Sequence, residues 1–121
     1  MAQPVVLVAE DDPSVQLTLR FVLEDAGFQV VVASDGEQAL AVVRAAPPDA
    51  ILLDFMMPKL TGLEVLNALR RDDRTATIPV MMLTGMAHSE MRALDGGVEY
   101  VSKPFSPDDL VGRLRSLVGR S

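Results

Sequence analysis

The stretch AILLDFMMP, residues 50–58, begins with a short apolar run that ends in an acidic residue, Asp54. A continuous apolar run, without alternating polar residues, is typical of a strand buried on both faces of a parallel sheet. Four more short apolar runs occur along the chain, so the sequence predicts five buried strands. They are Val5–Ala9, Val30–Ala33, Ala50–Leu53, Val80–Leu83 and Tyr100–Ser102.

Apolar residues at helical spacing separate these strands. Val15, Leu19, Val22 and Ala26 recur every three or four residues, and Gly27 then follows as a candidate C-cap. Comparable stripes precede the third and fourth strands and follow the fifth. They are formed by Leu40 and Val43, by Leu63, Leu66 and Leu69, and by Leu110, Leu114 and Leu117.

The segment Met86–Glu99 has the weakest helical pattern, with room for at most about three turns before Gly96 and Gly97. The last helix has a clear start, because Ser106 can be its N-cap and Pro107 its first residue. The elements thus alternate as β-α five times. Such alternation favours a parallel sheet with right-handed crossovers and helices on both faces.

The composition excludes several classes of protein. The chain has 121 residues, and its 17 acidic against 11 basic residues give a formal net charge of −6. We therefore expect one soluble domain, residues 1–121, that binds no nucleic acid directly, because such binding needs phosphate neutralisation. No apolar run approaches the length of a membrane helix, and the first residues lack the pattern of a signal peptide. The absence of Cys excludes disulfides and thiolate chemistry and is consistent with a cytoplasmic location.

Polar side chains follow four of the predicted strands, at the point where each strand ends. In a parallel sheet these ends lie at one edge, which is where ligands bind in open α/β sheets. Three or four carboxylates, one hydroxyl and one ammonium group would then lie close together. They are Glu10, Asp11 and Asp12 after the first strand, Asp54 after the third, Thr84 after the fourth and Lys103 after the fifth.

This set of groups is suited to phosphoryl chemistry. Clustered carboxylates repel one another, and a hard divalent cation such as Mg²⁺ relieves the repulsion. Lys103 and Thr84 are suited to phosphoryl oxygens, as a point charge and as a hydrogen-bond donor. An aspartate in the middle of the set, Asp54, can attack phosphorus and become an aspartyl phosphate. Each feature has a plainer reading when taken alone, since acids after strands often cap helices and a lysine is usually a surface charge.

Four short motifs in this order resemble the receiver domain of bacterial two-component response regulators, similar to the chemotaxis-type single-domain receiver. The resemblance covers essentially the whole chain. It implies a flavodoxin-like, doubly wound (βα)5 fold whose five parallel strands have the order 2-1-3-4-5. The motifs are Glu10-Asp11-Asp12, Asp54 to Pro58 with Gly62, Thr84-Gly85 and Lys103-Pro104-Phe105.

The resemblance also implies a role for each site residue. Asp54 would be the phosphoacceptor and Lys103 would hold a phosphoryl oxygen. Asp11 would bind the metal, Mg²⁺ or Mn²⁺, together with Asp54. Glu10 would contribute nearby or through a water molecule, and the backbone carbonyl of Met56 would be a further ligand.

The resemblance further implies a switch. Thr84 would move toward the phosphoryl group, Gly85 would leave space for this approach, and Tyr100 would change between exposed and buried rotamers. The surface of the fourth helix, fifth strand and fifth helix would then change. The Lys103–Pro104 bond would be cis, and Asp12 either extends the acidic cluster or caps the first helix.

The expected partners are a sensor histidine kinase or phosphotransfer protein and a downstream output domain or protein. The resemblance also allows a phosphorylation-dependent dimer. Such a domain is not an enzyme in the ordinary sense, because it catalyses only its own phosphorylation and dephosphorylation.

Two features depart from the family pattern. Lys103 follows Thr84 by only 19 positions, which predicts a shortened or irregular fourth helix within Met86–Glu99. Met56 and Met86 occupy positions that influence hydrolysis of the phosphoryl group in receiver domains. Because neither can hydrogen-bond strongly to an attacking water, we expect slow loss of the phosphoryl group.

His88, the only histidine, is expected to be merely exposed.

Three other readings remain. A phosphatase of the haloacid-dehalogenase type needs a second Asp two residues after the nucleophile, where this chain has Met56. A mononucleotide-binding flavoprotein would have a phosphate loop rich in Ser, Thr and Gly after the first strand, which is acidic here. A phosphorylation-independent interaction module would keep the fold without the chemistry.

Overall fold

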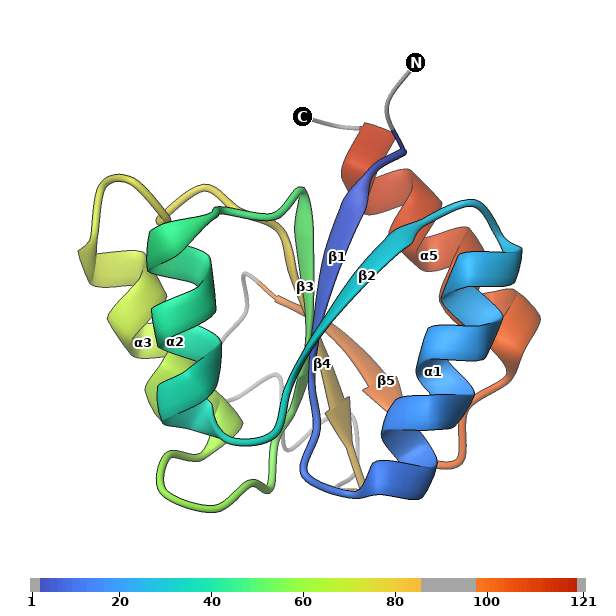
Figure 1. Cartoon of the computed structure of the whole chain (residues 1–121), viewed down its shortest axis with the longest axis horizontal. Coiled ribbons are helices and arrows are strands. Elements are labelled where there is room, and N and C mark those ends of the chain that lie inside the picture. The colour runs from blue at the N-terminus through green and yellow to red at the C-terminus, as the bar shows by residue number, and fades with distance from the viewer. Residues whose placement is uncertain (1–2, 86–97, 120–121) are drawn as a thin grey trace.

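Five parallel strands form the centre of the molecule (Figure 1). The computed structural model describes residues 3–85 and 98–119. The strand order is β2-β1-β3-β4-β5, so the predicted 2-1-3-4-5 topology is confirmed. Four strands differ slightly from the prediction: the second and fifth begin one residue earlier, and the third and fourth include the polar residue that follows each apolar run. The strands are β1 (Val5–Ala9), β2 (Gln29–Ala33), β3 (Ala50–Asp54), β4 (Val80–Thr84) and β5 (Glu99–Ser102).

Four helices lie in the described part of the chain and cover both faces of the sheet. Helices α1 and α5 lie on one face, and α2 and α3 lie on the other (Figure 1). The predicted fourth helix, with its expected shortening, lies outside the described residues, as do Met86 and His88. The helices are α1 (Pro13–Asp25), α2 (Gly36–Ala45), α3 (Gly62–Arg71) and α5 (Pro107–Gly119).

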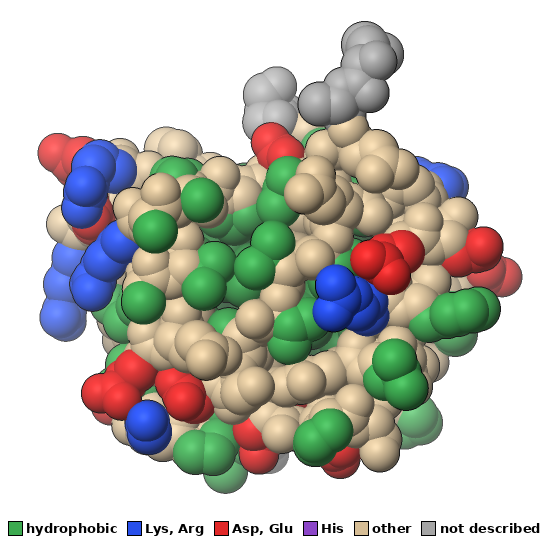
Figure 2. Space-filling model, viewed as in Figure 1, with side chains coloured by type: hydrophobic (Ala, Val, Ile, Leu, Met, Phe, Trp, Pro, Cys, Tyr) green, Lys and Arg blue, Asp and Glu red, His purple; other side chains and the backbone are tan. Residues whose placement is uncertain are grey.

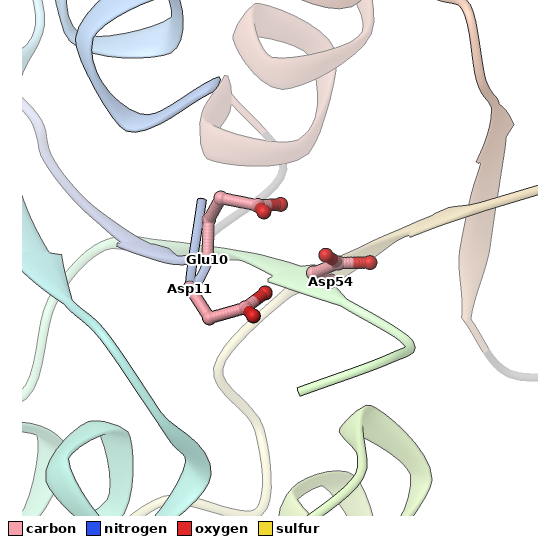
Figure 3. Close-up of side chains that lie close together, drawn as sticks. All are labelled: Glu10, Asp11 and Asp54. Atoms are coloured by element: carbon pink, nitrogen blue, oxygen red, sulfur yellow. The ribbon is translucent and has the colours of Figure 1, made fainter. Parts of the chain in front are cut away.

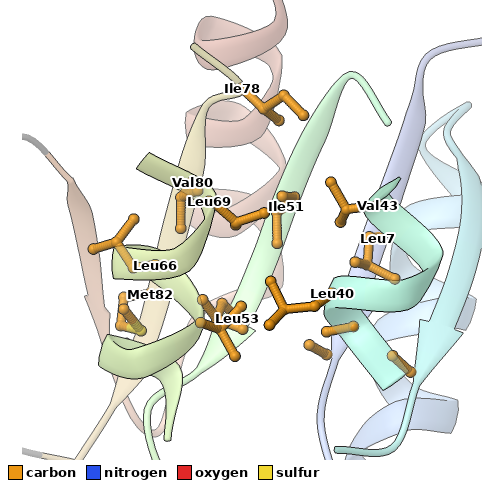
Figure 4. Close-up of a cluster of buried hydrophobic side chains, with 14 of the residues drawn as sticks. Leu7, Leu40, Val43, Ile51, Leu53, Leu66, Leu69, Ile78, Val80 and Met82 are labelled. Atoms are coloured by element: carbon orange, nitrogen blue, oxygen red, sulfur yellow. The ribbon is translucent and has the colours of Figure 1, made fainter. Parts of the chain in front are cut away.

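The core has two halves because successive strand residues point to opposite faces. One half lies between the sheet and α2 and α3, and it includes Leu40, Leu66 and Leu69 (Figure 4). The other half lies under α1 and α5. The strands buried on both faces therefore consist mainly of apolar residues, with polar residues such as Asp54 and Thr84 only at their ends. These apolar runs made the strands recognisable in the sequence.

Local contacts explain where the elements begin and end. Asp12 is the N-cap of α1, since its side chain accepts a hydrogen bond from the backbone N–H of Ser14. Gly27 follows α1 with a φ of 98°, a conformation that glycine adopts without strain. The Lys103–Pro104 peptide bond is cis, as the resemblance implied.

Charged side chains of both signs occur together on the face seen in Figure 2, where Lys and Arg lie beside Asp and Glu. No helix in the described residues is both long enough and apolar enough to cross a membrane.

Candidate functional site

Three carboxylates lie together at the carboxyl edge of the sheet (Figure 3). Glu10 and Asp11 follow β1, and Asp54 is the last residue of β3, the strand that pairs with β1. One carboxylate oxygen from each of the three residues lies within 4.8 Å of the others. Glu10 and Asp54 are buried, whereas Asp11 is exposed. The cluster is thus open on one side, and its geometry is that of a site that can hold a divalent cation.

Lys103 brings a positive charge into this cluster from β5. Its Nζ lies 3.1 Å from Asp54 Oδ2 and 3.7 Å from Glu10 Oε2. The start of the loop after β5 is held to β4, because the backbone N–H of Lys103 donates to the carbonyl of Thr84 at 2.8 Å. The ammonium group therefore lies over the two buried carboxylates while remaining partly open to solvent.

Glu10 is the least satisfied group of the cluster. Its Oε1 accepts a hydrogen bond from the backbone N–H of Asp12 at 3.1 Å, but its buried Oε2 accepts none from the part of the chain that the structure describes. Burial, together with the neighbouring Asp54 carboxyl, raises the pKa of Glu10 from 4.5 to about 7, against the opposing effect of Lys103. A buried carboxylate oxygen without a hydrogen-bond donor, beside two other carboxylates, is what a bound cation would complete.

Met56 contacts Asp54 through its backbone. Its N–H donates to Asp54 Oδ1 at 3.3 Å, and its side chain is 68 % exposed. The predicted metal contact of its backbone carbonyl remains a prediction. An amide donor at this oxygen can stabilise negative charge that develops beside Asp54.

Thr84 and Tyr100 connect the cluster with the outer strands. Thr84 is the last residue of β4, is buried, and pairs with Ser102 of β5. Tyr100 pairs with Met82, and only 4 % of its surface is exposed, so its side chain is in the buried rotamer. The structure therefore brings together the charged groups of Glu10, Asp11, Asp54 and Lys103. Thr84 lies at the end of the neighbouring strand β4, and the side chain of Asp12 caps α1.

Gly62 packs closely against the backbone of Asp54. A Cβ at this position would lie 2.6 Å from the backbone oxygen of Asp54 and 2.9 Å from Cα of Phe55. The N–H of Gly62 donates to the carbonyl of Phe55 at 2.8 Å, which closes the β3–α3 loop. Only glycine permits this close approach of two backbones.

Gln16 is a polar residue of the site region that sequence reasoning missed. Its side-chain amide donates to the backbone carbonyl of Glu10 and to Ser34 Oγ, the latter at 3.2 Å. The sequence offered no specific signal beyond a polar residue in the second turn of a helix that follows the acidic motif. The contact became visible only once β1 and β2 were placed side by side.

Known proteins share both the sequence pattern and the fold. The family model described as response regulator receiver domain matches residues 6–115. The DNA-binding dual master transcriptional regulator RpaA of Synechocystis sp. is 40 % identical over 121 residues, which cover 98 % of this chain and 50 % of that protein. The chain thus spans about half the length of this curated relative.

Two solved structures extend the comparison. The receiver domain of the Francisella response regulator 1452 superimposes with a TM-score of 0.90 at 35 % identity, and the match covers 98 % of each chain. The receiver domain of the sensor histidine kinase PA1611 from Pseudomonas aeruginosa PAO1 gives a TM-score of 0.89 at 28 % identity, covering 98 % of this chain and 99 % of that one. That neighbour was solved with a magnesium ion coordinated in its active site cleft.

Proposed function

Because the chain belongs to the response regulator receiver domain family, we propose that it acts as a two-component signalling switch through phosphorylation of Asp54. The observation that carries this proposal is the 3.1 Å contact between Lys103 Nζ and the buried carboxylate of Asp54, inside a cluster of two further carboxylates. A phosphoacceptor needs an ionised oxygen, a nearby cation for the incoming phosphoryl oxygens and a site for a metal. Asp54 is the residue of the cluster that has all three within reach.

The donor set fits Mg²⁺, or Mn²⁺ in its place. Both are hard cations that prefer carboxylate and carbonyl oxygens, and the cluster offers such oxygens from Asp11, Asp54 and Glu10. The buried Glu10 Oε2, which accepts no hydrogen bond from the described residues, supports this fit. In the proposed site Asp11, Asp54 and the carbonyl of Met56 hold the ion, with Glu10 contributing nearby or through water. When bound, the ion neutralises charge on the phosphoryl oxygens.

The transfer follows from the position of Asp54. One of its carboxylate oxygens attacks the phosphorus of a phosphohistidine on the donor protein. The new O–P bond forms as the N–P bond breaks, and the bonding electron pair leaves on the imidazole nitrogen. Lys103 exchanges its contact with Asp54 for a phosphoryl oxygen, and the N–H of Met56 supports the neighbouring oxygen.

The phosphoryl group on Asp54 changes the contacts of residues in β4 and β5. A phosphoryl group brings a charge of about −1.5 to −2 and three strong acceptors, so the Thr84 hydroxyl gains a new partner. Tyr100, which is buried in this structure, is then held in the buried rotamer, and the surface near β5 and α5 changes. This is a population shift between two arrangements, biased by a local change in charge.

Receiver domains are not enzymes in the ordinary sense, and their general partners are histidine kinases and output domains. For this chain we propose a sensor histidine kinase or phosphotransfer protein as donor and an output domain or protein as reader. We also propose that the chain catalyses only its own phosphorylation and dephosphorylation.

The test is the intact mass after incubation with Mg²⁺ and acetyl phosphate. We expect a gain of about 80 Da, one phosphoryl group, in the parent. Asp54→Asn and a sample with chelator should show no gain. Glu64→Gln, which replaces a carboxylate of the α3 capping box, is the matched control and should gain the same mass.

The absence of any adduct in the parent, together with no spectroscopic response to beryllofluoride, would contradict the proposal. The reading as a phosphorylation-independent interaction module would then be preferred.

A further inference from the structure

The peptide that joins Glu10 to Asp11 is held at its carbonyl by one side chain from α1. The Gln16 amide donates to the carbonyl of Glu10 and also to Ser34 Oγ at 3.2 Å. The N–H of Glu10 donates to the carbonyl of Ala33 at 3.0 Å. Residue Glu10 is therefore held on both sides of its Cα, by β2 through its N–H and by Gln16 through its carbonyl.

This restraint extends to Asp11 because a peptide unit is planar. The carbonyl of Glu10 and the N–H of Asp11 belong to one plane, so the hydrogen bond to that carbonyl also restricts the position of Asp11 Cα. The Asp11 side chain is exposed and, among the described residues, it makes no hydrogen bond or ion pair. Its carboxylate thus depends on the backbone for its direction toward the cluster.

A second glutamine continues the connection. Gln38 of α2 accepts a hydrogen bond from the backbone N–H of Ser34, the residue whose hydroxyl meets Gln16. These hydrogen bonds connect the turns that follow β1 and β2 with the N-terminal parts of α1 and α2. Gln16 is the member of this chain of contacts that touches the acidic motif itself.

We propose that Gln16 is a positioning residue for the metal site, which orients the Glu10–Asp11 peptide and so pre-aligns the two carboxylates for Mg²⁺. Groups that hold metal ligands in place raise affinity because less order has to be created on binding. The inference rests on the proposed metal-dependent function, and it concerns a residue outside the motifs of the family.

Gln16→Met is the direct test. Methionine keeps the length and the helix propensity of glutamine, removes both N–H donors and leaves the net charge unchanged. We expect the dissociation constant for Mg²⁺, measured from amide chemical shifts of Asp11 and Met56, to rise about fivefold, the effect of losing about one neutral hydrogen bond. In phosphorylation by acetyl phosphate, the half-saturating Mg²⁺ concentration should rise by the same factor, while the rate at saturating Mg²⁺ stays within about twofold of the parent.

Gln29→Met is the matched control. It makes the same chemical change at an exposed position at the opposite end of β2, and we expect no change in Mg²⁺ affinity. Ser34→Ala removes one of the two acceptors of the Gln16 amide but leaves the bond to Glu10. It should change the dissociation constant less than twofold. If Gln16→Met does not fold, Gln16→Asn takes its place, because it keeps the amide but is too short to make the same contact with the Glu10 carbonyl. Gln16→Asn should raise the dissociation constant by the same factor as Gln16→Met.

Three results would overturn the proposal. The first is an unchanged Mg²⁺ affinity in Gln16→Met, with or without a lower melting temperature, because a merely structural residue affects only stability. The second is an equal loss of affinity in Gln29→Met or Ser34→Ala. The third is a parent that binds no Mg²⁺. A parent that binds Mg²⁺ but accepts no phosphoryl group would contradict the proposed function and leave the role of Gln16 supported by the affinities.

Discussion

At the scale of single residues, we expect Glu10 to make the stability of the domain depend on pH. Its pKa is raised from 4.5 to about 7, chiefly by burial. The unfolded chain therefore releases this proton at lower pH than the folded chain does, so the folded state loses relative stability as pH rises through this window. Without metal, we expect the free energy of unfolding in urea to fall by about 3 kcal/mol at most between pH 5 and pH 8.

Glu10→Gln is the variant that isolates this effect. The amide cannot ionise, so the decline with pH should be largely removed and the variant should be more stable than the parent at pH 8 in a chelator. The exposed Asp72, whose pKa is lowered by Arg74, changes stability with the opposite sign and only at lower pH. An equally steep decline in Glu10→Gln would assign the pH dependence to other groups.

The Glu10 carboxyl should also affect the proposed binding of Mg²⁺. A cation competes with the proton on Glu10, so Mg²⁺ should bind more tightly as pH rises through about 7 and should release a proton as it binds. We expect the apparent dissociation constant to fall about tenfold from pH 6 to pH 8 and then to level off. Titrations of the parent and Glu10→Gln in parallel check this, since the variant should bind more weakly with little dependence on pH.

Met56 is expected to slow hydrolysis of the aspartyl phosphate. Its side chain is 68 % exposed beside Asp54 and has no group that can hydrogen-bond strongly to an attacking water. Met56→Asn supplies such a group and should shorten the lifetime of the phosphoryl group severalfold. The decay of the phosphorylated mass after removal of the donor measures this, with Met57→Leu, a buried neighbour of similar volume, as the control. Equal lifetimes in the parent and Met56→Asn would refute the prediction.

At the scale of elements, two glycines offer opposite predictions. A Cβ on Gly62 would lie 2.6 Å from the backbone of Asp54 and 2.9 Å from that of Phe55, whereas a Cβ on Gly112 in α5 meets no described atom within 4 Å. Gly62→Ala should cost about 2 kcal/mol of stability and slow phosphorylation, because the β3–α3 loop must shift. Gly112→Ala should gain about 0.5–1 kcal/mol, since alanine favours the helix. Thermal unfolding of both variants checks this, and a neutral Gly62→Ala would show that the loop yields easily.

The elements themselves could largely be predicted from the sequence because each leaves a local signal. The buried strands form continuous apolar runs apart from their ends, and Gly27 and Ser106 mark helix boundaries in ways that need no tertiary information. Asp12 could not be assigned, since the same residue type serves as a cap and as a metal ligand. The extension of β3 to Asp54 was missed because a charged residue is usually taken as the end of a strand, although here Asp54 still pairs with Leu83 of β4.

At the scale of the whole molecule, the strand order and the meeting of the acidic cluster with Lys103 could be expected once the family pattern was recognised. The contacts of Gln16 could not. They include a hydrogen bond between Gln16 in α1 and Ser34, which are 18 positions apart in the sequence. Sequence periodicity does not indicate which of many polar side chains will contact a given carbonyl. The orphaned oxygen of Glu10 was likewise unpredictable, because it depends on how deeply the carboxyl is buried.

A series of contacts connects Asp54 with β5, and we expect the fluorescence of Tyr100 to report phosphorylation of Asp54. Lys103 contacts Asp54 and is tied by its N–H to Thr84, and Tyr100 lies buried on the same strand pair. The chain has one Tyr and no Trp, so intrinsic fluorescence reports Tyr100 alone. Tyr100 is buried in this structure, so a response requires that an exposed rotamer is also populated in solution. If phosphorylation favours the buried rotamer, beryllofluoride with Mg²⁺ should then reduce quenching of this fluorescence by acrylamide.

In the same experiment, Thr84→Ala separates the binding of beryllofluoride from the response of Tyr100. It removes the hydroxyl that we propose links the phosphoryl site to β4, so beryllofluoride should still bind while the quenching of Tyr100 stays at its starting value. A fall in quenching that is as large in Thr84→Ala as in the parent would mean that Tyr100 responds without this hydroxyl. Quenching that is already low and unchanged in the parent would mean that the buried rotamer is the resting state, so the switch would have to act through a surface other than that of Tyr100.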